Sequence, residues 1–413
     1  MSVRRRVVLK GMLAAGALVA APAILRAQST PVRIGFLTIK TGPLASGGLQ
    51  MEQGLSVFFK QRNNTLAGRP VELHTADTGG NPAQARTKTQ ELVERLNVGV
   101  LIGPLAAFEA LAIDDYVRSS RTPILSVAGA EDMTQRKPNP WFVRPSCTSA
   151  QPSHPMADYA ANELKYKRVA TIGDDFAFGH ECVAGFHRVF EDNGGKVVQK
   201  LWTPLNAPDY GTYISQLKTD IDAVFTAHAG SNGFKFIRQL REYGNRTQIL
   251  GGFTPVDESL LQQMGDDALG AMTGSWYSAE LDYPVNKTFV EAIRREYRLD
   301  PGVYAAETYV CGEVLEHAAK AVNGKIEDKD TFIKALREAK VPDTLRGPVR
   351  FDELVNVVGN IYLRKVEKKD GRYVNAVIKT YPDVSQFWTY KEDEFLKSPV
   401  YSRDYPPAKN LEP

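Results

Sequence analysis

A glycine-rich loop near the N-terminus has the spacing of a phosphate-binding loop. The segment GFLTIKTGPLASGGLQ, residues 35–50, is an apolar run followed by small residues, and four residues separate Gly42 from Gly47. A nucleotide-binding P-loop needs Lys and then Ser or Thr directly after its last glycine, because these side chains contact phosphate and Mg²⁺. Gly48 and Leu49 occupy those places. We therefore predict that the loop brings backbone N–H groups to an anion other than a nucleotide.

Other residues capable of catalysis or metal binding lack the spacing that either function needs. The sequence has no HExxH, CxxC or GxSxG segment, so we predict no catalytic residue, no metal and no cofactor. Asp174 and Asp175 form a carboxylate pair that general acid–base catalysis would need. An acid directly before a predicted helix is more often a cap for the free N–H groups of that helix.

The elements that must position these loops alternate between strand and helix. The predicted strands are Val32–Thr38, Val71–Ala76, Val98–Ile102 and Pro123–Val127, followed by Arg168–Ile172, Lys196–Trp202, Ala223–Ala227 and Gln248–Gly251. Helical stretches such as 49–61, 82–96 and 179–193 separate them. This alternation predicts parallel sheets covered by helices on both faces. Two such series predict two α/β lobes, which also suits the length of the chain.

Five of these strands end in turns made of small residues. Ligands of open parallel sheets bind outside the carboxyl ends of the strands. The turns lie near 42–48, 103–107, 128–130, 173–179 and 228–233. We therefore expect a ligand cleft between the lobes, with Ser46, His228 and Gly230 among its residues.

The first 27 residues have the composition of an export signal. Arg4, Arg5 and Arg6 precede a run of small and apolar residues that is too short to span a membrane. The arginines resemble the twin-arginine export pattern, so we predict a periplasmic protein cleaved after Ala27 or Ala23. The chain has 51 basic and 48 acidic residues, and the signal carries five basic residues and no acid, so the remainder has a net charge of −2. This charge argues against nucleic acid or an anionic membrane as a partner.

The second half of the chain contains two irregular segments and a change of pattern. Residues 144–150 and Thr273–Ser275 interrupt the alternation. Helices are predicted over Val285–Tyr297, Ala305–Ala321 and Thr331–Ala339, strands over Asn360–Val366 and Tyr373–Lys379, and an extended tail from residue 395. Cys147, Cys182 and Cys311 allow at most one disulfide, and the sequence leaves their pairing open.

The ordered set of motifs resembles the type I periplasmic-binding proteins of bacterial ABC importers, close to the leucine/isoleucine/valine-binding branch. The motifs are VRIGFLTIKTGPLASGG, LAGRPVELHTADTGGNPAQA, VGVLIGP, ILSVAGA, DDFAFG and DYGTYISQLKTDIDAV. The resemblance implies two Rossmann-like lobes with parallel sheets, joined by three crossovers near 145–149, 273–277 and 346–351, which close on a ligand. The implied parts are lobe 1 at 28–145 plus 277–346, lobe 2 at 146–276 plus 347–394, and a tail at 395–413.

The resemblance also implies where a ligand binds. Its carboxylate would be held in lobe 1 by the turns 105–108 and 128–130, where Ala107 and Ala130 replace the usual hydroxyl side chains, so backbone N–H groups are expected to bind it. Phe253 stands where an acid usually meets the ammonium of an amino acid; with a shifted register, Asp257 or Glu258 would supply that acid. The predicted ligand-binding residues are Ser46, Leu105, Ala106, Ala107, Phe108, Ala128, Gly129, Ala130, Phe178, His228, Gly230, Phe253, Trp276 and Tyr277.

These residues favour an aromatic or other non-amino organic acid as the ligand. An ammonium buried without a partner costs several kcal/mol, whereas aromatic side chains suit a ring. The hypothesis is a monomeric receptor, not an enzyme, that delivers this acid to a membrane permease. Three alternatives stay open: a receptor for branched-chain or other hydrophobic amino acids, a ligand sensor, and an exported hydrolase.

Overall fold

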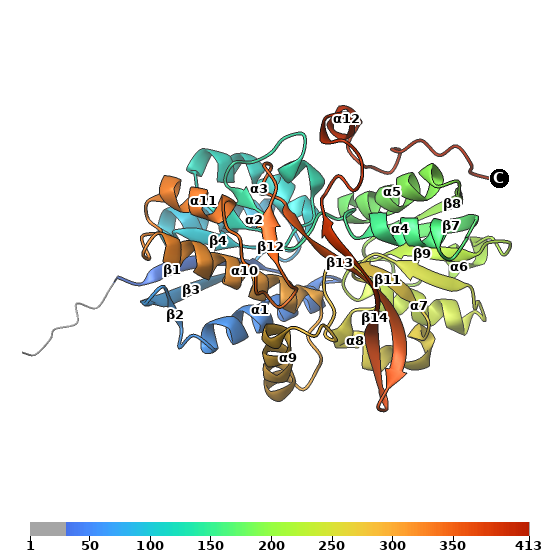
Figure 1. The fold of residues 1–413 in the computed structure, drawn as a ribbon, viewed down its shortest axis with the longest axis horizontal. Helices are drawn as coiled ribbons and strands as arrows, with labels where there is room; N and C mark the ends of the chain where they lie inside the picture. The colour runs from blue at the N-terminus through green and yellow to red at the C-terminus, as the bar shows by residue number, and fades with distance from the viewer. Residues whose placement is uncertain (1–29, 413) are drawn as a thin grey trace, which may run out of the picture.

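The computed structural model describes residues 30–412 and has two α/β lobes (Figure 1). One lobe is built on a six-stranded sheet of order β2-β3-β1-β4-β5-β6, and the other on an eight-stranded sheet of order β12-β13-β11-β10-β9-β7-β8 with β14 beside β13. The two-lobed α/β fold predicted from the sequence is confirmed. The predicted export signal, residues 1–27, lies outside the described residues.

The sheet of the first lobe is parallel apart from its short β2 edge. Its strands are β1 Val32–Thr38, β2 Thr65–Leu66, β3 Arg69–Asp77, β4 Val100–Ile102, β5 Ile124–Leu125 and β6 Phe142–Val143. The helices that follow them are α1 Ala45–Lys60, α2 Pro82–Gln90 with a π-helical turn to Arg95, and α3 Ala107–Ser120. β1 pairs in parallel with β3 and β4. It is almost wholly buried and apolar, as expected for a parallel strand covered by helices on both faces.

The sheet of the second lobe has a parallel centre and an antiparallel extension. Its strands are β7 Arg168–Asp174, β8 Lys196–Thr203, β9 Ala223–Ala227, β10 Gln248–Gly251, β11 Met272–Ser275, β12 Val349–Phe351, β13 Val357–Lys369 and β14 Arg372–Val384. Its helices are α4 Ser153–Asn162, α5 Ala177–Asp192, α6 Gly211–Gln216, α7 Asn232–Glu242 and α8 Glu258–Met264. β11 pairs in parallel with β10 and antiparallel with β13, so it joins the two parts of the sheet.

Three later helices return to the first lobe, so each lobe contains segments far apart in the sequence. They are α9 Pro284–Tyr297, α10 Val303–Ala321 and α11 Lys329–Arg337. α10 packs against α1 (Figure 1), and the Thr308 hydroxyl donates a hydrogen bond of 2.8 Å to the Met51 carbonyl oxygen between them.

One buried arginine connects the segments that cross between the lobes. The Arg346 guanidinium donates to the carbonyl oxygens of Pro145, Ser146 and Asn360, and it lies 4.8 Å from the centre of the Trp276 ring. Pro145, Trp276 and Arg346 belong to three different crossing segments. Because the side chain is fully buried, its hydrogen bonds to the backbone satisfy donors that water cannot reach.

Thr273–Ser275, predicted to be a break in the pattern, lies within strand β11, and this prediction is wrong. Glycine is uncommon inside strands. At Gly274 it is needed, because a side chain there would overlap the Pro152 carbonyl oxygen. The glycine therefore lets the start of α4 lie directly on the sheet. The chain leaves the second lobe just after this strand.

The segment from residue 395 is anchored rather than free. It begins within a short helix, α12 Glu392–Lys397. The side chains of Phe395 and Tyr401 are buried. The Arg136 guanidinium, from the first lobe, donates to the Ser398 carbonyl oxygen at 2.7 Å. On the second lobe, Glu412 pairs with Arg168 at 2.6 Å. The C-terminal segment therefore contacts both lobes.

Candidate ligand-binding pocket

A pocket lies between the lobes, beside the ends of several parallel strands. Its lining residues are Leu44, Leu105, Ala106, Ala107, Val127, Gly129, Phe176, Phe178, Ala229, Phe253, Tyr304 and Glu307. Its volume is about 20 Å³, room for about one water molecule, so the walls nearly meet in this arrangement. The lining is mostly apolar, with a few polar groups from three walls.

The first wall is the start of α3 in the first lobe. Ala106 is extended, with φ −90° and ψ 144°, and the helix begins at Ala107. The Ala106 N–H group donates to the Glu109 carboxylate at 3.2 Å. Within residues 30–412, the N–H groups of Ala107 and Phe108 donate no hydrogen bond. Because the N-terminal end of a helix also carries partial positive charge, this wall suits an anion.

The turn after β5 adds to this wall. Gly129 lines the pocket, and its N–H group also makes no hydrogen bond within the described part of the chain. A side chain at Gly129 would overlap Ser149 of the neighbouring crossing segment. Glycine is therefore needed where this turn passes close to that segment.

The second wall consists of three phenyl rings from the second lobe. Phe176 and Phe178 flank the start of α5, with ring centres 6.0 Å apart, and Phe253 follows β10. The Phe178 and Phe253 rings meet edge to face at 5.5 Å. Edge-to-face and offset arrangements are those that aromatic rings prefer, and the cluster gives the pocket an aromatic surface.

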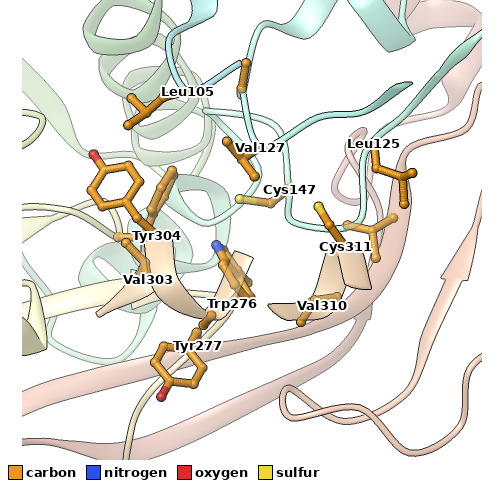
Figure 2. Packing of buried hydrophobic residues seen from close by; sticks show 14 of the residues in the cluster. Leu105, Leu125, Val127, Cys147, Trp276, Tyr277, Val303, Tyr304, Val310 and Cys311 are labelled. Carbon is orange, nitrogen blue, oxygen red and sulfur yellow. The ribbon is translucent and has the colours of Figure 1, made fainter. Parts of the chain in front are cut away.

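The third wall is α10. Figure 2 shows Tyr304 on the same side as Leu105, and both residues line the pocket. One turn further along the helix, Glu307 is only 2% exposed. Burial raises the pKa of the Glu307 carboxyl well above its usual range, opposed in part by the positive charge of Arg346.

The two lobes touch directly at the start of α10, which borders this pocket. Asp257 of the second lobe accepts hydrogen bonds from the Gln50 side chain at 3.1 Å and from the Val303 N–H group at 3.0 Å, both in the first lobe. The Gly230 N–H group lies 3.4 Å from the Tyr304 hydroxyl. The structure is therefore a closed arrangement, and opening it would break these contacts.

Six of the residues predicted to bind ligand line this pocket. They are Leu105, Ala106, Ala107, Gly129, Phe178 and Phe253. Phe108 lies just outside it, with its ring 5.6 Å from that of Phe176. Ser46, in α1, is also absent from the lining. The carbonyl oxygens of Ala128 and Ala130 accept hydrogen bonds from the buried Arg144 guanidinium, so these two residues face a structural partner.

Three other predicted residues lie in the core rather than in the pocket. His228 lies between two hydroxyls, with Nε2 3.1 Å from Thr203 Oγ1 and Nδ1 2.6 Å from Thr226 Oγ1, and burial lowers its pKa to about 3. Trp276 is buried beneath Arg346, and Tyr277 is buried and points away from Tyr304 (Figure 2). Gly230, by contrast, contacts the opposite lobe. A strand-end position in the sequence does not reveal which side of the turn a residue will face.

Sequence reasoning missed six lining residues. They are Leu44, Val127, Phe176, Ala229, Tyr304 and Glu307. Phe176 stands two residues before Phe178 in DDFAFG, and this repeat of phenylalanines is a signal that could have been used. Tyr304 and Glu307 carry no such signal, because only the return of α10 to the first lobe brings them to the pocket.

The two acids proposed for a shifted register have other partners. The Asp257 carboxylate accepts from the Ser259 N–H group at the start of α8, and the Glu258 carboxylate lies 2.9 Å from the Arg364 guanidinium. Neither lines the pocket. Glu307 is the one acidic side chain among the lining residues within 30–412.

Several other features of residues 30–412 bear on function. No group of three or more side chains is placed to hold a metal ion there, and no helix in this range is long and apolar enough to cross a bilayer. Cys147, Cys182 and Cys311 are buried free thiols. Burial raises the pKa of each of these thiols, so they are poor nucleophiles in this arrangement.

The chain is similar to known solute-binding proteins over most of its length. Residues 31–372 match the family described as periplasmic binding protein. Leu/Ile/Val-binding protein homolog 6 of Brucella abortus (strain 2308) is 28% identical over 365 residues, which cover 86% of this chain and 93% of the relative.

Two solved structures are similar in both sequence and fold. The solute-binding protein of an ABC transporter from Rhodopseudomonas palustris BisB5, in complex with 3,4-dihydroxybenzoic acid, is 32% identical with a TM-score of 0.82, covering 86% of this chain and 98% of that one. The corresponding protein from R. palustris HaA2, in complex with p-hydroxybenzoic acid, is 26% identical with a TM-score of 0.79, covering 87% of this chain and 99% of that one. This chain therefore belongs to the type I periplasmic binding proteins, the substrate-binding components of ABC transporters.

Proposed function

We propose that this protein captures an aromatic carboxylate in the periplasm and delivers it, as a monomer, to the permease of an ABC importer. The ligand carboxylate binds at the start of α3, where Ala107 and Phe108 have free N–H groups. Its ring lies against Phe176, Phe178 and Phe253. Closure of the lobes then buries the ligand.

The observation that carries this proposal is the pairing of a wall of N–H donors with a wall of phenyl rings. A benzoate presents the same two features, a carboxylate and a flat apolar ring joined directly to it. The ring cluster comes from the second lobe and the donors from the first, so the ligand would connect the lobes. Such a ligand stabilises the closed state by its additional contacts there.

An amino acid fits this pocket less well. Its ammonium lies on the carbon next to the carboxylate, so it needs an acceptor near the start of α3. Phe253 occupies the place of the usual acid, and Asp257 and Glu258 are engaged elsewhere. The similarity to Leu/Ile/Val-binding proteins keeps an amino acid as the second candidate.

Isothermal titration calorimetry distinguishes these ligands. The protein, freed of any co-purified ligand by unfolding and refolding, is titrated with benzoate, 4-hydroxybenzoate, cinnamate and leucine. We expect at least one aromatic acid to bind with Kd in the micromolar range or below, about −8 kcal/mol, and leucine to bind at least 100-fold more weakly. Tight binding of leucine and no binding of the acids would contradict the proposal.

The same samples test the two remaining alternatives. A hydrolase would convert its ligand, so mass spectrometry after prolonged incubation should recover the added acid unaltered. A receptor for import should also restore growth on the acid when its gene is returned to a deletion strain that retains the permease. A sensor without a transport role would bind the acid but leave its uptake unchanged.

A further inference from the structure

We propose that Glu307 selects aromatic acids that carry a ring hydroxyl, by accepting the hydrogen bond that this hydroxyl donates. This inference rests on the proposed function, because it concerns the second end of the ligand whose carboxylate binds at α3. It adds a group that determines specificity on a third wall of the pocket.

Glu307 differs from the other buried acids of residues 30–412. Each of the others accepts at least one hydrogen bond or forms an ion pair: Glu109, Glu131, Asp174, Glu181, Asp257, Glu258, Asp300 and Glu313. Glu307 accepts none within this range, although it is 2% exposed and lines the pocket. Buried polar groups in native proteins nearly always have a partner. The missing partner is therefore expected to come from the ligand.

The ligand carboxylate is not a suitable partner. In the proposed arrangement it already accepts from the free N–H groups of α3, so Glu307 needs another partner. Burial raises the pKa of Glu307 well above its usual range, which favours the neutral form of its carboxyl. A neutral carboxyl still has a carbonyl oxygen that accepts a hydrogen bond.

An α-ammonium is not a suitable partner either. The N–H donors belong to α3, whereas Glu307 belongs to α10, a separate helix that enters the pocket from another wall. In this proposal the donor that meets Glu307 is a different group of the ligand from the carboxylate and approaches a different wall of the pocket. The three phenyl rings favour an aromatic spacer between the two ends. A ring hydroxyl meets these conditions.

Tyr304 is placed to support such a contact. It lies one helical turn before Glu307 and also lines the pocket, and its hydroxyl is near the Gly230 N–H group of the other lobe. A hydroxylated ligand at Glu307 would therefore bind beside a contact that forms only when the lobes are closed.

A series of matched ligands tests the inference. Wild-type protein is titrated by calorimetry with benzoate, 3-hydroxybenzoate, 4-hydroxybenzoate and 4-methoxybenzoate, the last of which has the ring oxygen but no donor. We expect one of the hydroxybenzoates to bind about tenfold more tightly than benzoate, the effect of one hydrogen bond made in a buried site. The methoxy compound should show no gain over benzoate.

Variants then connect the preference with Glu307. Glu307→Met has a similar length and no acceptor, so the ratio of the hydroxybenzoate affinity to the benzoate affinity should fall from about ten to about one, whatever the change in the benzoate affinity itself. Glu307→Gln keeps a carbonyl acceptor and should keep most of the preference. Glu313→Gln is the matched control: Glu313 is a buried acid on the same helix, but it accepts the Leu345 N–H group and does not line the pocket. It should leave the ratio of the two affinities unchanged.

The outcomes separate this inference from the proposed function. If wild-type protein binds benzoate but gains nothing from either hydroxyl, or if Glu307→Met keeps the full preference, the inference is wrong while the proposed function stands. If no aromatic acid binds, both are wrong. The wild-type series gives this answer even if Glu307→Met does not fold.

Discussion

Two helices begin at the same pocket from opposite lobes and contribute different groups to it. Both α3 and α5 follow a parallel strand, and the residue before each helix, Ala106 or Phe176, is extended and makes no side-chain cap. At α3 the flanking residues Ala106 and Ala107 line the pocket, and the Ala107 N–H group has no partner within residues 30–412. At α5 the phenyl rings of Phe176 and Phe178 line the pocket instead. The same backbone arrangement thus brings alanines to the pocket from one lobe and phenyl rings from the other.

The largest effect should come from removing one donor of α3. Proline fits the first position of a helix without distorting it but has no N–H group. Ala107 is that position, and the extended Ala106 before it is compatible with a following proline. We expect Ala107→Pro to weaken binding of the aromatic acid about 100-fold, because it removes a hydrogen bond to a charged group, measured by calorimetry.

Ala177→Pro is the matched substitution in the second lobe. Ala177 is the first residue of α5 and also follows an extended residue, but it does not line the pocket. The affinity of Ala177→Pro for the aromatic acid should stay within threefold of wild type. Circular dichroism should show that both proline variants are folded. Equal losses in the two variants would show that the two helix starts do not differ in the way described.

A smaller effect is expected from removing one ring of the second lobe. Phe178→Ala takes away a ring that contacts Phe253 edge to face at 5.5 Å and faces the pocket. We expect binding of benzoates to weaken about 30-fold, which corresponds to about 2 kcal/mol of lost apolar contact. Phe178→Leu should recover part of this loss. An unchanged affinity in Phe178→Ala would mean that the ring wall does not contact the ligand.

The smallest effect concerns the support of the donor wall. Burial raises the pKa of Glu109, which binds the Ala106 N–H group, to about 7 from the ordinary value of 4.5. Between these values the folded state binds more protons than the unfolded state, so its stability falls as the pH rises from about 4.5 to about 7. Between pH 5 and pH 8, wild type should therefore lose on the order of 1 to 2 kcal/mol more stability than Glu109→Gln.

Urea unfolding at the two pH values measures this difference. Asp328→Asn is the control, because Asp328 is an exposed helix cap whose pKa is lowered by its hydrogen bonds to Thr331. A lowered pKa makes stability depend on pH only in more acidic solution, so this variant should follow wild type between pH 5 and pH 8. A Glu109→Gln variant that also follows wild type would contradict the prediction.

Most of the strands and helices predicted from the sequence lie close to the observed ones. β1, β9 and β10 begin and end at the predicted residues, because each is an apolar run bounded by polar residues or turns. The misassigned strand β11 has a physical reason: Gly274 is required by a close contact with Pro152, which local pattern cannot reveal.

For the pocket, the sequence by itself determined the groups that follow strands: the alanine and glycine turns of the first lobe and two phenylalanines of the second. These positions could be predicted from local sequence, because each turn directly follows the strand that positions it. Only the tertiary structure decided that His228, Trp276 and Tyr277 are buried in the core and that Tyr304 and Glu307 line the pocket. The reason is that α10 is placed by its packing against α1, about 250 residues earlier in the chain, and no local pattern encodes a contact over that separation.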